Sequence, residues 1–272
     1  MLGRQPSAKG LPMTSVTQTH TRVLAAQFGV LVGIVALWQG AAESGVIDAN
    51  RSGAPTAIAA QFVRSIASGE LWPHLQTTLY EQIVGFAIGV GGGTLAAWGL
   101  WWTPTLRSAL DPFVAIFNGI PKIALAPPMI VWFGIYETSK IALAAMICLT
   151  IAWMAAAEGV RRTDPDRIDM IRGMGGSSLR VFRLVIAPSS LPWIISAMKI
   201  NIGFALVGAV VGEFVASNQG LGYMAVQASM FFQINKLWMV VLVIASIAAL
   251  QYFVVLWFER RVLHWATDET PS

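Results

Sequence analysis

Charge is scarce in this sequence. Only 12% of its 272 residues are Asp, Glu, Lys or Arg and 56% are hydrophobic, whereas ordinary soluble domains carry about 25% charged residues. The chain has one cysteine, Cys148, and three widely separated histidines, His20, His74 and His264. We therefore expect no disulfide framework and no metal site. These shortages indicate an integral membrane protein.

Nucleotide-binding and catalytic patterns are also missing. Two groups of glycines stand out, Gly89 with 91–93 and Gly173 with 175–176, but no Gly-Lys-Ser/Thr follows either of them. Small residues in an apolar run are more typical of close packing between membrane helices. The basic residues flank apolar runs instead of alternating with aromatic ones, so nucleic acid is not an expected partner. We expect no catalytic residues and no cofactor held by this chain.

Long apolar runs are abundant. A bilayer core of about 30 Å needs roughly 20 helical residues to cross it. Five runs fit this length, and a sixth, 112–136, contains Lys122 and three prolines and should form a broken or bent helix. The regular runs are 23–42, 82–102, 141–157, 193–212 and 237–258. The first is longer than the 7–15 apolar residues of a signal peptide, which favours an uncleaved anchor.

The distribution of basic residues predicts the orientation. With six spans and an internal N-terminus, twelve Lys and Arg residues fall in inside segments and four in outside segments. The positive-inside rule then places both termini in the cytoplasm. The expected organisation is a disordered cytoplasmic tail over 1–22, one membrane domain over 23–258 and a cytoplasmic tail over 259–272.

The segment 158–192 gathers much of the charge. Asp164-Pro165 is typical of a helix start, and Gly175-Gly176 is typical of a helix end that needs a backbone with positive φ. Ser177 predicts the cap of a second short helix, which Pro188 and Pro192 should redirect into the next span.

Two interpretations of this segment follow from its residues. It is either an amphipathic loop whose arginines meet anionic lipid head groups, or a docking site for a cytoplasmic partner. The second accounts better for the acids that are mixed among the arginines.

The segment resembles the cytoplasmic signature of permease subunits of bacterial ABC importers. That signature reads E-A-A, three residues, G, nine residues and I-x-L-P. This chain has Asp169-Met170-Ile171, three residues, Gly175, nine residues and Val185-Ile186-Ala187-Pro188. The spacing, the glycine and the proline are kept, while Asp replaces Glu and other apolar residues replace Ala, Ile and Leu.

Further motifs are similar to the nitrate/sulfonate/taurine group of these permeases, over about residues 60–265. They are Gly-Ile-Pro-Lys-Ile-Ala-Leu-Ala-Pro at 119–127, Trp-Phe-Gly at 132–134, Gly-Glu-Phe at 212–214, Gly-Leu-Gly-Tyr at 220–223 and Glu-Arg-Arg at 259–261. The resemblance implies an all-α protein of the bacterial inner membrane, with a type I ABC importer (MetI-like) fold and a coupling helix between spans four and five.

The resemblance also implies partners. Two copies of the permease would dock two cytoplasmic ATPase subunits, which bind ATP and Mg²⁺, and a periplasmic or lipid-anchored binding protein would deliver the solute. The residues implied in coupling to the ATPase are Asp169, Met170, Ile171, Arg172, Gly175 and Pro188.

Four residues are candidates for the translocation path: Asn118, Lys122, Lys199 and Glu213. Lys122 and Lys199 are the only charges inside the expected spans, and ionisable groups there are functional by default. Lys122 and nearby Asn118 lie in the broken span and would suit an anion; the alternative is a lysine that is general to the family and unrelated to the solute. Lys199 could instead reach the cytoplasmic face of the membrane. Glu213 belongs to the Gly-Glu-Phe motif. The segment 216–235 is interpreted as a periplasmic gate, a platform for the binding protein or interfacial packing.

The expected function is therefore an importer permease for a small anionic solute such as a sulfonate, nitrate or taurine. A pyrimidine-type vitamin precursor and an aromatic acid remain open as solutes. A secondary transporter or a membrane-embedded enzyme are alternatives from other classes, but the spans lack the coupling charges or catalytic groups that each would need.

Overall fold

The structure, a computed structural model, describes residues 14–262. Of the two expected tails, residues 1–13 and 263–272 lie outside this range. The chain divides into two units, Met1–Ala60 and Gln61–Ser272. In the first, α1 (Thr14–Glu43) is followed by the short helix α2 (Ala49–Ser52) and the start of α3 (Pro55–Ala67). The Gln39 side chain ties α1 to α3 through Thr56, donating to its Oγ1 at 3.1 Å and accepting from its N–H at 3.1 Å.

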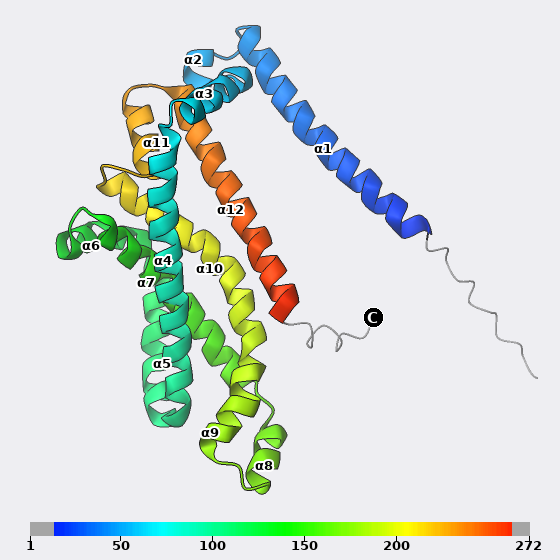
Figure 1. The fold of residues 1–272 in the computed structure, drawn as a ribbon, viewed down its shortest axis with the longest axis vertical. Coiled ribbons are helices and arrows are strands. Elements are labelled where there is room, and N and C mark those ends of the chain that lie inside the picture. Colours follow the sequence, from blue (N-terminus) through cyan, green and yellow to red (C-terminus); the bar gives the residue numbers. More distant parts are fainter. Residues whose placement is uncertain (1–13, 263–272) are drawn as a thin grey trace, which may run out of the picture. The chain divides into compact units, whose positions relative to one another are not determined.

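The second unit is helical throughout the part that the structure describes (Figure 1). After α3 come α4 (Leu71–Gly99), a 3-10 turn (Leu100–Trp102), α5 (Pro104–Gly119), a 3-10 turn (Lys122–Leu125), α6 (Ala126–Phe133), α7 (Glu137–Arg161), α8 (Pro165–Gly173), α9 (Ser178–Val181), a π-helical turn (Phe182–Ile186), α10 (Ala187–Val215), α11 (Leu221–Met230) and α12 (Ile234–Val262).

Five helices of the described chain are long and apolar enough to cross a membrane, and a sixth crossing is available if the broken pair 104–119 and 122–133 is one span. The pair bends by 89°. Ile120 is extended where α5 ends, and Pro121 has no N–H with which to continue the helix. The predicted all-α fold and the predicted break in the proline-rich span are thus confirmed.

Glycines bring α4 and α10 against α7. A Cβ on Gly85 would lie 2.6 Å from the Cβ of Ala144, and a Cβ on Gly208 would lie 2.8 Å from the Cα of the same residue. Gly89 and Gly93 of α4 also lie directly against α7, whereas Gly91 faces open space. Close packing through small residues, as predicted, therefore builds the core of this unit.

The second short helix of the 158–192 segment is not redirected by proline. α9 continues through the π-helical turn into α10, so that residues 178–215 form one candidate span. Pro188 lies in the first turn of α10, directly after the π-helical turn. Because proline cannot donate to the carbonyl four residues earlier, a locally widened turn accommodates it without breaking the helix. The prediction that Pro188 and Pro192 turn the chain was wrong.

The chain order gives the α4–α7–α10 bundle two distinct ends (Figure 1). The C-terminus of α7, the N-terminus of α10 and both α8 and α9 lie at one end, called here the loop end. The N-terminus of α7, the C-terminus of α10 and α11 lie at the other, called the α11 end. α4 runs between the two ends. Near the start of α4, Thr78 is hydrogen-bonded to α11, and near the end of α4, Trp98 is hydrogen-bonded to α10.

Candidate functional site

α8 begins and ends as its sequence predicts. The Asp164 carboxylate accepts from the N–H of Asp166 at 2.9 Å, and Pro165 occupies the first turn. At the other end Gly175 has φ +75°, and the N–H of Gly176 donates to the Ile171 carbonyl at 2.9 Å. These bonds satisfy the Asp166 N–H at the start of α8 and the Ile171 carbonyl at its end, so that α8 is a short helix capped at both ends.

One face of α8 is fixed to the bundle. Ile168 and Ile171 pack on a cluster formed by residues of α4, α7 and the α9–α10 helix. Its buried members are Val160, Val181 and Ile186, and Trp98, Phe182 and Trp101 of the 3-10 turn after α4 also pack against them. The indole of Trp98 additionally donates to the Ser190 hydroxyl at 2.9 Å. Ile168 and Ile171 thus share one apolar cluster with side chains of α4, α7 and the α9–α10 helix.

The other face of α8 is open. The Asp169 side chain is 75% exposed and lies 3.8 Å from Arg172, a weak pairing within one turn. Met170 is also exposed. Among the predicted coupling residues, these three form the outer face, Ile171 belongs to the fixed face, and Pro188 lies apart in α10. The exposed set combines both charges with an apolar side chain.

The translocation candidates occupy three separate places, with no hydrogen bond or ion pair of the described residues between them. In the broken span, the Lys122 ammonium donates to the Asn118 side chain at 3.1 Å and to its carbonyl at 3.2 Å. Lys199 of α10 forms an ion pair with Glu259 of α12 at 2.8 Å. Glu213 lies at the α11 end.

Glu213 anchors the start of α11. Its carboxylate is 1% exposed and accepts from the Thr78 hydroxyl at 2.6 Å and from the N–H of Gly222 at 2.5 Å. Thr78 in turn accepts from the N–H of Leu221 at 2.8 Å. Gly220 has φ +117°, and a Cβ there would overlap the Glu213 carboxylate. The Gly-Glu-Phe and Gly-Leu-Gly-Tyr motifs are thus two halves of one contact.

Two further buried charges at this end were missed by the sequence analysis. Glu81 of α4 is 0% exposed and Lys140 of α7 is 1% exposed. The Lys140 ammonium donates to the carbonyl of Tyr136 at 3.1 Å and also to that of Ile135. Gly212 makes room for it, since a Cβ there would lie 2.7 Å from Lys140 Cγ. Lys122 and Lys199 are therefore not the only charges within the spans.

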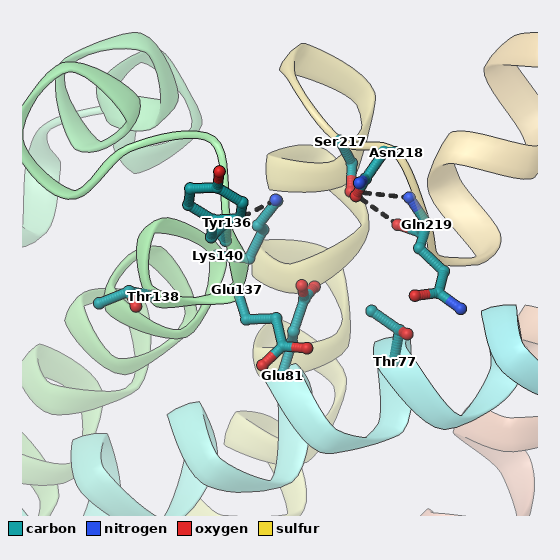
Figure 2. A pocket seen from close by; sticks show the side chains of 9 residues that line it. All are labelled: Thr77, Glu81, Tyr136, Glu137, Thr138, Lys140, Ser217, Asn218 and Gln219. Atoms are coloured by element: carbon teal, nitrogen blue, oxygen red, sulfur yellow. Dashed lines mark hydrogen bonds between the residues drawn. The ribbon is translucent and has the colours of Figure 1, made fainter.

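A polar pocket of about 410 Å³ opens beside these charges (Figure 2). Its walls are Thr77 and Glu81 of α4, four residues at the start of α7, and the segment 217–219 after α10. Figure 2 shows the Glu81 carboxylate rising from α4 beside that of Glu137, with Lys140 and the segment 217–219 around them.

Helical spacing is the signal that would have found Glu81. It lies four residues before Gly85, and Gly89 follows at the same interval, so that all three share the face of α4 that packs on α7. The predicted spans began at residues 82 and 141, whereas α4 begins at Leu71 and α7 at Glu137. Each predicted span, chosen by hydropathy, began directly after a charged residue, so Glu81 and Lys140 were left outside the spans.

Comparison with known proteins identifies the family. Residues 89–264 match the sequence profile of the binding-protein-dependent transport system inner membrane component. The chain belongs to this family. It is 30% identical to SsuC of Bacillus subtilis, a permease named for aliphatic sulfonates, over 95% of this chain and 96% of that one. It is 32% identical to the taurine transport system permease protein TauC of Escherichia coli, over 72% and 71% of the two chains.

The fold agrees with this assignment. A solved inward-facing structure of the MetNI methionine ABC transporter superposes on 70% of this chain and 93% of its own, with a TM-score of 0.59 and 20% sequence identity. Permeases of this family are not enzymes, because ATP is hydrolysed by separate ATPase subunits, and they work with substrate-binding partners. The chain is thus a multi-pass inner-membrane permease of an ABC importer.

Proposed function

We propose that this permease couples to its ATPase through the 164–188 loop and carries a small solute with a sulfonate-like anionic group. The observation that carries the proposal is α8 itself, a capped helix with one face packed on the bundle and the other exposing Asp169, Met170 and Arg172. A helix that only rested on lipid would have little use for exposed acids.

The mechanism follows from the two faces of α8. Closure of the ATPase pair would push on the exposed face, and the Trp98 and Phe182 contacts would pass that movement to α4 and α10. ATP binding would then favour one orientation of the transport path, through contacts that differ between the two states. The chain's own contribution is mechanical and needs no bound cofactor.

The solute class is supported by similarity and by the broken span. The relatives SsuC and TauC are named for aliphatic sulfonates and taurine. Lys122 lies at the break, where helix ends leave backbone groups available and where discontinuous transporter helices bind ions. Its contacts with Asn118 fix its position while leaving its positive charge without an acidic partner among the ion pairs of residues 14–262.

The proposed assembly has two copies of this chain with one ATPase subunit on each loop. Two small bundles that share one transport path between them are best related by a two-fold axis. The loop end would face the cytoplasm, because six arginines cluster in the segment 158–192. Both termini would then be cytoplasmic, and a reporter active only outside the cytoplasm should be silent when fused after Ser272. A strong signal there would reverse the orientation.

Gly175 allows a sharp test of the loop. A Cβ at this position would meet nothing within 4 Å, so that φ +75° is the only constraint on the residue. Valine there is strained by about 1–3 kcal/mol, whereas asparagine tolerates the left-handed region much better. Gly175→Val should reach the membrane at near-normal abundance but lose most of the co-purifying ATPase, and Gly175→Asn should retain it.

Co-purification and transport should be measured for both variants beside membrane abundance, and the mass of the parent complex gives its stoichiometry. Normal ATPase binding and transport by Gly175→Val would mean that the loop is a lipid-facing segment. Solute uptake by the chain without any ATPase would favour a secondary transporter instead.

A further inference from the structure

The floor of the pocket at the α11 end carries carboxylates that form no ion pair within the described chain. Glu81 and Glu137 line it from α4 and α7, and Lys140 is the one basic residue in its walls. Buried carboxylates are costly unless they are paired or hydrogen-bonded. Glu81 is buried, whereas Glu137 lies at the exposed start of α7. The burial of Glu81 therefore needs a reason.

Lys140 does not supply the missing partner. Two of its three N–H groups are directed to the carbonyls of Ile135 and Tyr136, and no ion pair of the described residues joins it to a carboxylate. The Glu81 carboxyl lies close enough to that of Glu213 to share a hydrogen bond with it, yet no N–H group or hydroxyl of the described chain donates to either of its oxygens. Glu81 is therefore a buried acceptor at the floor of the pocket that receives no N–H or hydroxyl donor from the surrounding helices.

The remaining walls suit a small polar solute. The volume of about 410 Å³ lies within the usual range of small-molecule pockets, about 300–1,000 Å³. Thr77, Thr138 and Asn218 contribute hydroxyl and amide groups. Ser217 shapes the loop that closes one side, because its hydroxyl donates to the Gln219 carbonyl at 2.6 Å.

We propose that this pocket binds the primary ammonium group of a small zwitterionic solute, with Glu81 and Glu137 as the acceptors. An ammonium carries three N–H donors and a positive charge, which complement two carboxylates. The anionic end of such a solute would meet the third N–H of Lys140 and the Asn218 amide. The pocket would thus favour amine-bearing sulfonates and carboxylates over anions that lack the amine.

This inference rests on the proposed function in one respect. The pocket lies at the end of the bundle opposite α8, which is where a binding protein would deliver solute if α8 meets the ATPase. It is independent of Lys122, which would contact an anion farther along the path.

Binding of taurine, an aminosulfonate, to the full-length permease with its ATPase in lipid nanodiscs tests the proposal. Radiolabelled taurine should bind, and ethanesulfonate, which lacks the amine, should compete at least about tenfold more weakly. Glu81→Gln and Glu137→Gln should each weaken taurine binding by about tenfold or more, as expected for a charge-assisted hydrogen bond. Glu70→Gln removes the same charge from a residue paired with Lys236 at 2.6 Å, outside the pocket, and should leave binding unchanged.

Three results would overturn the proposal: no taurine binding to the parent, equal competition by ethanesulfonate, or parent-like binding by both Gln variants. The last would mean that Glu81 only shares a proton with its neighbour Glu213. If Glu81→Gln fails to fold, Glu137→Gln decides alone, because Glu137 lies at the exposed start of α7. ATPase co-purification, measured on the same samples, reports the loop separately, so failure of either proposal can be recognised.

Discussion

The two ends of the bundle hold their charges in opposite ways. At the loop end, acids and arginines face outward and pair within one helical turn, as Asp169 and Arg172 do. At the α11 end, Glu81, Lys140 and Glu213 are buried, and the last two are held by backbone groups of surrounding segments. If α8 docks the ATPase as proposed, charge would serve recognition by another protein at the first end, whereas at the second end Lys140 and Glu213 fix internal geometry through their hydrogen bonds.

Substitutions at the loop end should therefore change partner binding, whereas substitutions at the α11 end should change stability. Surface pairs contribute little to stability because water screens them, so substitutions in α8 should alter partner binding with little effect on folding. Buried groups with several partners should behave in the reverse way. Two substitutions of the same kind, each removing one carboxylate, test this contrast.

Removing the carboxylate of Glu213 should have the larger effect on stability. Glu213→Ala leaves the Thr78 hydroxyl and the Gly222 N–H without their acceptor, which should cost about 2–6 kcal/mol, since each orphaned group costs about 1–3 kcal/mol. The thermal unfolding midpoint of the purified permease should fall clearly. Glu213→Gln, which keeps one acceptor oxygen, should lose less. A midpoint unchanged in both variants would show that α11 is held by other contacts.

Removing the carboxylate of Asp169 should leave folding almost intact. Asp169→Ala breaks only an exposed pair at 3.8 Å, so that the free energy of unfolding should change by less than about 1 kcal/mol. The amount of co-purifying ATPase should nevertheless drop, by less than in Gly175→Val, because the helix keeps its shape. Arg172→Ala removes the other member of the pair and separates loss of the pair from loss of the acid. A drop in the unfolding midpoint as large as that of Glu213→Ala would contradict the contrast.

Local rules predicted the loop end well. Asp164-Pro165 and Gly175-Gly176 act through their own and adjacent backbone groups, so their roles can be inferred from the sequence. The path of the chain after Ser177 could not be predicted from local rules alone, because a π-helical turn accommodates Pro188 where a regular helix would have been interrupted.

The α11 end was harder to predict because its groups meet through tertiary packing. Glu213 and Gly222 were both recognised as motif residues, but their hydrogen bond depends on how α11 returns to α10 and α4. Glu81 was excluded by hydropathy, which treats a charge as the end of a span. The helical face that it shares with Gly85 and Gly89 indicates that it is buried, but not which groups surround it.

The contact between Gly212 and Lys140 has an evolutionary consequence. The lysine side chain occupies the space that any larger residue at 212 would need, so residue 212 cannot become larger while the lysine stays. A lineage that shortens residue 140 opens room for alanine or serine at 212, while one that keeps the lysine keeps the glycine. An alignment of relatives in which residue 212 varies freely beside a retained lysine would contradict this. Paired changes at 140 and 212 would instead show covariation that reflects this steric constraint.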